Sequence, residues 1–337
     1  MKFSILMPVF NTSLFLDEAI QSVLNQSYGD WELIVLNDGS TDDSETIILK
    51  YANLSSKIRY YKQSNKGLLQ TRRKLIELSS GEYIVFIDSD DKLVFNHLEK
   101  INNVIALHNP EIVLFKYKAL KGAKLTEYNL ELCNEKGSSC MVDNHLKIYS
   151  HLVGSTKLNN LVCKVIQSNF FKNDPTNYLI FGNLKNGEDL LQSIPLLFRA
   201  KKIFFLNESL YIYRQHNTSM SKVYGPKTIN DIITVNNFLK KYLLSIPKIH
   251  YYKKSNLYIH TFILKILVHY KISLNNSQFL TFIKELNSSL EKIDKSFKYF
   301  SIKLILINFS IRSNFILLII TIFKRFIHLL KKFNKYE

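Results

Sequence analysis

The residues best suited to do chemistry lie in the run Tyr83–Asp91, where an apolar segment leads directly into aspartates at positions 88, 90 and 91. Carboxylates crowded into four positions repel one another unless a cation lies among them. Their oxygens suit a hard divalent ion, and such ions often bridge protein carboxylates to the phosphates of a substrate. Taken alone, such a run is more often a solvated acidic turn, so its surroundings must decide.

A second acidic turn supplies those surroundings. Asn37–Asp43 follows the apolar run Leu33–Leu36, and its Asp38 could accept a hydrogen bond from a nucleobase N–H. The simpler interpretation is a turn with a helix cap at Ser40 or Thr41. Ligands of parallel α/β sheets bind just beyond the carboxyl ends of the strands. Two acidic turns at one such edge therefore favour a site for a metal-bound diphosphate.

The elements that must position these turns alternate along the first hundred residues. Apolar runs predict strands at 3–9, 33–36, 58–61 and 83–87, and helical spacing predicts helices at 13–25 and 68–78. This alternation implies a parallel sheet with right-handed crossovers. Further on, we expect strands at 112–117, 202–206 and 210–213, a loop at 121–139, a helix at 187–198 with Pro195 inside it, and mostly helix from about 228.

Composition describes a globular chain of 337 residues, with 46% apolar and 22% charged residues. Three cysteines without metal-ligand spacing favour a reducing compartment and argue against a disulfide framework. Pro8 breaks the apolar start, which favours a buried strand of a cytoplasmic protein over a signal segment. Residues 1–110 carry a net charge of −3 and residues 111–337 carry +20. The second part therefore suits an anionic surface, either a membrane or nucleic acid.

Several ordered motifs together closely resemble the family 2 glycosyltransferases. They are the segments Ser4–Asn11, Gln21–Gln26, Glu32–Asp42, and Gly81–Tyr83 leading into Asp88–Asp91. The resemblance covers roughly residues 1–220. It implies an α/β GT-A fold, which is Rossmann-like with a mainly parallel sheet flanked by helices. We assign this domain to residues 1–222 and a mostly helical, basic, membrane-surface-associating extension to residues 223–337.

The resemblance also implies roles for single residues. It places the donor nucleotide against Pro8, Val9, Phe10, Asn11, Asp38, Arg72, Asp88 and Ser89, with Asp38 addressing the base. Asp90 is the main ligand of Mn²⁺ or Mg²⁺, together with Asp88 and His216. Arg72 fits either a phosphate-facing or an aspartate-pairing role. Arg73 and Leu75 depart from the family pattern, and the role of Arg73 stays open.

The proposed chemistry also needs a base, because an inverting transfer must remove the proton of the acceptor hydroxyl. Gly187-Glu188-Asp189 resembles the family's Glu-Asp motif, which makes Asp189 the base and Glu188 its support. By spacing alone, the same residues would simply favour a helix N-terminus. Arg214, in a segment resembling the one that closes over the donor, would neutralise charge on the departing diphosphate.

The basic C-terminal stretch is the remaining feature. Its longest uncharged run, Ser313–Phe323, has eleven residues and is shorter than the roughly 20 of a spanning helix. Helices lying on an anionic leaflet are favoured, with ordinary core helices and a true span as alternatives. Such a location, peripheral on the inner face of the plasma membrane, suits a lipid-linked acceptor. Nucleic-acid binding is not expected, since the charges alternate with aliphatic residues.

The sequence therefore predicts a metal-dependent inverting enzyme that moves a hexose or N-acetylhexosamine from a UDP-sugar to a glycan of the lipopolysaccharide, capsule or exopolysaccharide kind. The rival is a non-catalytic scaffold that binds membranes or nucleic acid and keeps a vestigial pocket. A nucleotidyltransferase is disfavoured, because residues 8–13 are not the glycine-rich basic loop that it would carry after the first strand.

Overall fold

The computed structural model describes residues 2–127, 130–154, 158–182, 184–216 and 226–246, all within one compact unit comprising Met1–Thr261. The predicted alternation of strands and helices is confirmed in its first half. The elements there are β1 (Phe3–Val9), α1 (Ser13–Leu24), β2 (Trp31–Asn37), α2 (Ser44–Leu54), β3 (Ile58–Lys62), α3 (Leu68–Leu78), β4 (Tyr83–Phe86), β5 (Lys92–Leu93) and α4 (His97–His108). Every residue of β1, β2 and β4 is buried, as the apolar runs of a sheet covered on both faces require.

The second half mixes short strands and helices. Its elements are β6 (Ile112–Lys121), β7 (Lys124–Glu127), β8 (Cys140–Met141), α5 (His145–Gly154), η1 (Leu161–Cys163), β9 (Lys164–Gln167), α6 (Ser168–Lys172), η2 (Tyr178–Phe181), α7 (Glu188–Arg199), β10 (Ile203–Arg214) and α8 (Pro226–Leu243). The helix around Pro195 forms as expected, with the proline inside α7.

One sheet joins these strands in the order β3-β2-β1-β4-β9-β6-β10-β5. The pairs β1–β2, β1–β4, β2–β3 and β6–β10 are parallel, whereas β9 runs antiparallel to both β4 and β6. β1 and β4 therefore end side by side, and β2 ends next to β1. The turns that follow β1, β2 and β4 therefore lie at a common edge, as predicted for the two acidic turns after β2 and β4.

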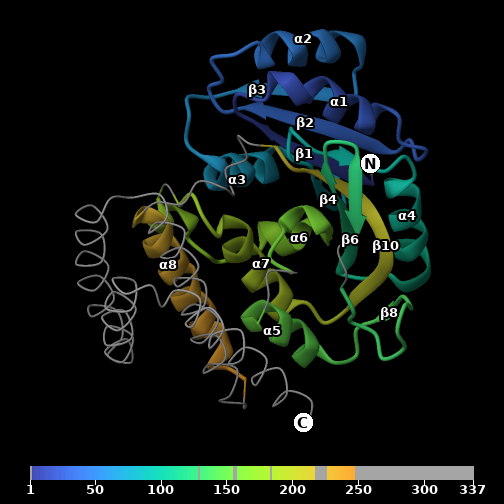
Figure 1. The fold of residues 1–337 in the computed structure, drawn as a ribbon, viewed down its shortest axis with the longest axis vertical. Coiled ribbons are helices and arrows are strands. Elements are labelled where there is room, and N and C mark those ends of the chain that lie inside the picture. Colours follow the sequence, from blue (N-terminus) through green and yellow to red (C-terminus); the bar gives the residue numbers. More distant parts are fainter. Residues whose placement is uncertain (1, 128–129, 155–157, 183, 217–225, 247–337) are drawn as a thin grey trace, which may run out of the picture. The chain divides into compact units, whose positions relative to one another are not determined.

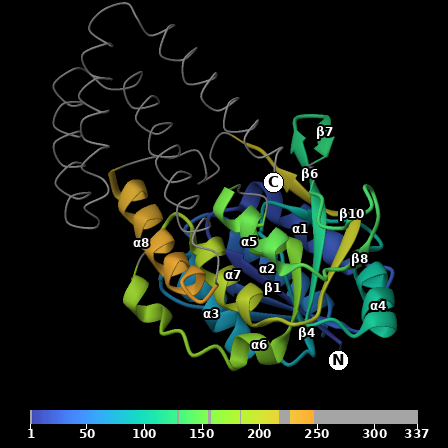
Figure 2. The same ribbon diagram turned by 90° about the horizontal axis from the view of Figure 1, so that it is seen from below.

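Helices cover both faces of the sheet, with α1 and α2 on one side and α3, α6 and α7 on the other (Figure 1). α4 lies against β10, and α8 lies along α7 in both views (Figures 1 and 2). No described helix combines the length and apolar character needed to cross a bilayer. The basic segment around Ser313–Phe323 lies outside the described residues, and the division after residue 222 stays a prediction.

Two predicted elements are corrected. The strands expected at 202–206 and 210–213 form a single strand, β10, in which the register against β6 shifts between Leu206 and Tyr211. These shifts accommodate the polar residues 207–209, which sequence reasoning took as a break. Part of the loop expected at 121–139 is strand, because β6 continues to Lys121 and pairs with β7 across the turn at Gly122.

The cysteine prediction is also corrected. Cys133 and Cys140 form a disulfide, with their Cα atoms 5.9 Å apart, while Cys163 is buried and free. Cys140 is in β8, which pairs with β10, so the disulfide ties residue 133 of the preceding segment to the sheet. The sequence separation of seven residues resembles no recognised framework, which is why the pairing was not predicted.

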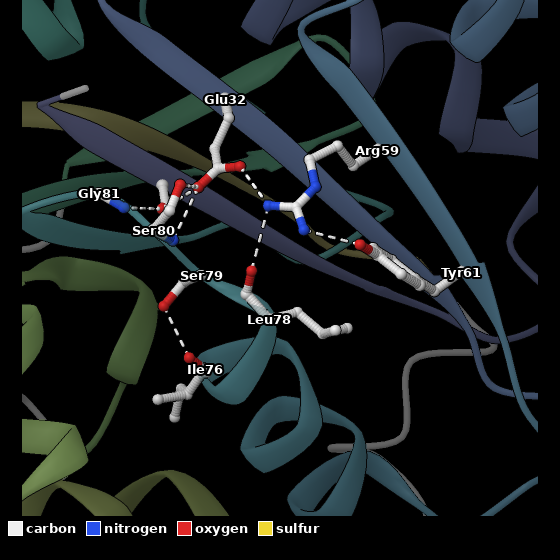
Figure 3. Close-up of polar contacts among 9 residues, drawn as sticks. Glu32, Arg59, Tyr61, Ile76, Leu78, Ser79, Ser80 and Gly81 are labelled. Carbon is white, nitrogen blue, oxygen red and sulfur yellow. Dashed lines mark hydrogen bonds and ion pairs between the residues drawn. The ribbon is translucent and has the colours of Figure 1, made fainter.

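The buried carboxylate of Glu32 joins the starts of the strands, at the ends away from the acidic turns, and Figure 3 shows its contacts with Ser80 and Arg59. Glu32, 2% exposed, accepts hydrogen bonds from Ser4 Oγ (2.6 Å), Ser80 N (2.9 Å) and Arg59 Nη1 (2.7 Å). Burial opposes its ionisation, yet these donors hold the pKa of Glu32 below its usual range. A Cβ at Gly81 would lie 2.5 Å from the Ser4 nitrogen, so only glycine fits there. The contacts hold the first residues of β1 to β4 in fixed register.

His97 gives the fold a pH dependence. It is fully buried at the start of α4, where Nδ1 donates to the Leu210 carbonyl over 3.0 Å. Burial lowers the pKa of His97 from 6.5 to about 4, so between these values the unfolded chain binds a proton that the fold excludes. The stability that this group contributes is therefore fully present above the pKa of His97 in the unfolded chain. On acidification to about pH 5 the free energy of unfolding should fall by about 2 kcal/mol. Urea unfolding across this range measures it.

The His97→Gln variant should lose that part of the pH dependence, because glutamine does not titrate. His108→Gln is the matched control, since His108 is exposed at the other end of α4 and should keep the wild-type slope. An unchanged slope in His97→Gln would contradict the assignment.

Candidate active site

The acidic turn after β4 is anchored from behind by β10. Asp91, 1% exposed, accepts hydrogen bonds from Tyr211 Oη and Arg214 N, each at 2.7 Å. The Asp88 N–H donates to the same Tyr211 oxygen over 3.1 Å. Burial, with the charges of Asp90 and Asp88, raises the pKa of Asp91 well above its usual value. Asp91 therefore serves the fold, while the side chains of Asp88 and Asp90, 29% and 26% exposed, remain for a ligand.

Arg72 joins this turn to the proposed base. It lies on α3 and is only 1% exposed, with Nη2 2.9 Å from Asp88 Oδ1 and Nη1 paired with Asp189 Oδ1. Burial opposes its charge, but the carboxylates of Asp189, Asp88 and Glu188 raise the pKa of Arg72. Of the two roles predicted for Arg72, the structure has the aspartate-pairing one. A phosphate-facing role for Arg72 stays a prediction.

The local electrostatics favour a bound cation. Burial, followed by the charges of Asp189 and Asp90, raises the pKa of Asp88 to about 6 despite the pairing with Arg72. Burial and the charge of Asp189 raise the pKa of Glu188 to about 8. These groups thus resist carrying all their negative charges at neutral pH, and a divalent cation would relieve that repulsion.

The end of β10 brings two predicted residues to the same place. His216 Nε2 lies 2.8 Å from Asp90 Oδ2, and Arg214 Nε donates to the Asp90 carbonyl over 3.0 Å. Phe15 on α1 packs against both, 4.7 Å from the His216 ring and 5.0 Å from the Arg214 guanidinium. Glu18, also on α1, accepts from Arg214 Nη2 at 2.8 Å. Phe15 and Glu18 were missed, because nothing in their spacing distinguishes them from other helix residues.

Asp38 lies at the end of β2 but is largely committed to the loop before α3. Only 3% exposed, it accepts hydrogen bonds from Gln63 Nε2 (2.8 Å), Lys66 N (2.9 Å) and Gly67 N (2.9 Å). These contacts place the first turn of α3, and so support Arg72 one turn further on. Contact of Asp38 with a nucleobase stays a prediction.

The loop after β1 lies against the loop after β2. Pro8 and Val9 are buried in β1, whereas the Phe10 side chain is 46% exposed. Asn11 adopts a left-handed backbone with φ 53°, a conformation that asparagine tolerates better than most residues. Its N–H donates to Ser40 Oγ over 3.0 Å, so the two loops form one rim.

Two further residues from the sequence analysis, Ser89 and Arg73, make definite contacts in the structure. Ser89 is buried and accepts a hydrogen bond from Thr12 Oγ1 at 2.9 Å, which ties the acidic turn to the loop after β1. Arg73 points elsewhere and stacks on the Tyr178 ring of η2 at 4.5 Å. This contact packs Arg73 of α3 against η2.

The donor set fits a hard divalent ion in its chemistry. Asp88 and Asp90 offer carboxylate oxygens, the ligands that such ions prefer, and His216 Nε2 lies 2.8 Å from Asp90 Oδ2. Among the described residues, no three such side chains are already arranged as a metal cage. One oxygen of Asp88 pairs with Arg72 and one oxygen of Asp90 lies against His216.

Comparison with known proteins supports one family. A family model described as Glycosyl transferase family 2 matches residues 4–144. An uncharacterized glycosyltransferase of Haemophilus influenzae is 30% identical over 258 residues, which are 74% of this chain and 92% of that protein. The minor teichoic acid biosynthesis protein GgaB of Bacillus subtilis is 31% identical over 230 residues, 67% of this chain and 24% of that protein. The chain spans only 14% to 33% of the longer relatives that it matches.

The fold has solved counterparts. S. aureus TarS 1–349 in complex with UDP-GlcNAc superposes with a TM-score of 0.66 at 19% identity, covering 87% of this chain and 82% of that chain. This likeness shows the GT-A fold, a mainly parallel sheet with helices on both faces. The chain belongs to the family 2 glycosyltransferases.

Proposed function

We propose that this protein transfers a hexose or N-acetylhexosamine from a UDP-sugar to the growing chain of a surface glycan, inverting the anomeric carbon. One observation carries the proposal. Arg72 holds Asp88 and Asp189, which lie 16 and 117 positions away along the chain, at a single guanidinium. This arrangement supports assigning Asp88, a predicted metal and nucleotide residue, and Asp189, the predicted base, to one site.

The relatives supply the substrate class. TarS was solved with UDP-GlcNAc and with UDP, which supports a uridine diphosphate donor. GgaB is named for minor teichoic acid biosynthesis, which supports a cell-surface glycan as the acceptor. A lipid-linked acceptor, or a lipopolysaccharide, capsule or exopolysaccharide product, is an extension of the same proposal.

In the proposed reaction, Asp189 accepts the proton of an acceptor hydroxyl as the hydroxyl oxygen attacks the anomeric carbon of the donor sugar. The new glycosidic bond forms while the bond from that carbon to the β-phosphate oxygen breaks, and UDP leaves with the electron pair. Arg72 holds the Asp189 carboxylate toward the acidic turn. Arg214, fixed by Glu18 and the Asp90 carbonyl, stands where a cation offsets charge on the diphosphate.

Asp90, Asp88 and His216 are the residues that would hold Mn²⁺ or Mg²⁺. When bound, such an ion neutralises charge on the pyrophosphate.

We place the protein at the cytoplasmic face of the plasma membrane. The net charge of +20 on residues 111–337 supports this, because anionic leaflets attract basic segments. The Cys133–Cys140 disulfide is the observation against it, since reducing compartments keep thiols unpaired.

Calorimetry of the full chain with UDP and Mn²⁺ tests the proposed function. Binding heat should require both ligands, because Asp88 and Asp90 would hold the ion and the ion would offset the charge of the diphosphate. In Asp90→Asn, which removes one ligand charge, Mn²⁺-dependent UDP binding should weaken by at least about tenfold.

Asp43→Asn is the control, since Asp43 is an exposed aspartate in the neighbouring turn before α2. No binding heat with UDP and Mn²⁺, together with strong binding to liposomes or DNA, would instead support the rival hypothesis of a non-catalytic scaffold. Release of UDP from a panel of nucleotide sugars then identifies the donor.

A further inference from the structure

Helix α8 contacts residues 185–187, the segment that leads into Asp189, the proposed base. Asp231, 6% exposed, accepts hydrogen bonds at Oδ2 from the backbone N–H groups of Lys185 (3.0 Å) and Asn186 (3.2 Å). Thr228 Oγ1 lies 3.3 Å from Asn186 Nδ2 and accepts from it. The two polar residues of α8 are three positions apart and so share one helix face.

The next residue of the segment meets the same face. Gly187 has φ 87° and would place a Cβ only 3.2 Å from Val235 Cγ2. Val235 lies one turn beyond Asp231 and is 2% exposed. Residues 185, 186 and 187 are therefore each fixed by α8 immediately before Glu188 and Asp189 begin α7.

Gly187 is the residue at which the chain enters α7. Gly187 caps α7 without any side-chain hydrogen bond, and its left-handed backbone is the conformation that sets the direction of the first turn. Arg72 holds the Asp189 carboxylate from the opposite side. The backbone before Asp189 is thus set by α8, and the end of the side chain is set by α3.

We propose that Asp231 is a positioning residue for the proposed base, acting through the backbone of residues 185–187. This inference rests on the proposed function. It makes α8, which follows the predicted glycosyltransferase domain in the sequence, a working part of the site. Misplacement of a catalytic group by about 1 Å can cost about 10²-fold in rate, so the effect should appear in kcat.

The test compares Asp231→Ala with Glu111→Ala in the full chain. Glu111 is a matched control because its carboxylate also accepts from two consecutive backbone N–H groups, those of Lys201 and Lys202, at the start of β10. We expect kcat to fall about 10- to 100-fold in Asp231→Ala with KM for the donor within about twofold of wild type. Glu111→Ala should keep the wild-type kcat. Asp231→Asn, which retains an acceptor oxygen, should recover most of the rate.

Amide hydrogen exchange supplies a readout that does not depend on turnover. Asp231→Ala should lose protection at residues 185–186 and in the first turn of α7, and Glu111→Ala should keep it. Retained protection, an unchanged kcat, or equal losses of kcat in both variants would overturn the inference. If the wild-type chain processes no nucleotide sugar, the proposed function fails. The exchange measurement then still decides whether Asp231 holds the segment.

Discussion

Replacing Asp189 with asparagine is expected to lower the rate of sugar transfer between about 10²- and 10⁴-fold, the usual contribution of a general base. A carboxamide cannot take the proton of the acceptor hydroxyl. Its oxygen can still accept from Arg72 Nη1, so the pairing that holds the site together should survive. UDP binding in the presence of Mn²⁺ should therefore stay close to wild type. Single-turnover transfer and calorimetry on the same preparation separate the two effects.

Glu188→Gln provides the neighbouring control. Because the pKa of Glu188 is raised to about 8, glutamine resembles the protonated form already present at neutral pH. This variant should lose much less activity than Asp189→Asn. Transfer by Asp189→Asn within tenfold of wild type would remove Asp189 as the base, and a larger loss in Glu188→Gln would transfer that role to Glu188.

Replacing Arg72 with methionine should damage both stability and activity. Methionine fills similar space but leaves Asp88 and Asp189 facing each other without their shared cation. We expect a loss of about 3 kcal/mol, at the lower end for broken buried pairs because both carboxylates are partly exposed. Mn²⁺-dependent UDP binding and transfer should fall with it, since Asp88 and Asp189 lose their fixed positions. Urea unfolding and calorimetry measure the two losses.

Arg59→Met separates general damage from damage to the site. Arg59 also pairs with a buried carboxylate, that of Glu32 (Figure 3), but this pair lies near the starts of β2 and β3, away from the acidic turns. This variant should lose stability while UDP binding is retained. Should Arg72→Met fail to fold, the double variant Arg72→Met/Asp189→Asn removes one uncompensated charge and should regain stability. Wild-type stability and transfer in Arg72→Met would contradict the bridging role.

The parts of the site that could be predicted from the sequence are those specified by neighbouring residues. The apolar runs before Asp38 and Asp88 predicted strands, and parallel strands bring the turns after them to one edge. The family resemblance assigned Asp90 and His216 to one metal site, and their side chains lie 2.8 Å apart, while binding of a metal stays a prediction. The division of the acidic turn into exposed Asp88 and Asp90 and buried Asp91 was not predicted, because Tyr211 lies 120 positions away from Asp91.

Contacts between distant elements account for the rest. Nothing in the spacing of Arg72 predicts that it pairs with Asp189, because Asp189 lies 117 positions away on α7. The same holds for Asp231, which meets Lys185 across 46 positions. β10 continues through its polar residues 207–209 because it pairs with β6 on both sides of them. The sequence alone predicted that these polar residues end one strand before another begins.

The grip of α8 on residues 185–187 has a practical consequence for any shortened form of the chain. A fragment that stops at residue 222 retains every residue assigned to chemistry but lacks Thr228, Asp231 and Val235. It would also expose Leu191 and Ile194 of α7, which pack in one apolar cluster with Leu239 of α8. The smallest fragment worth expressing therefore extends through Leu243, and weak activity in anything shorter would reflect the missing helix.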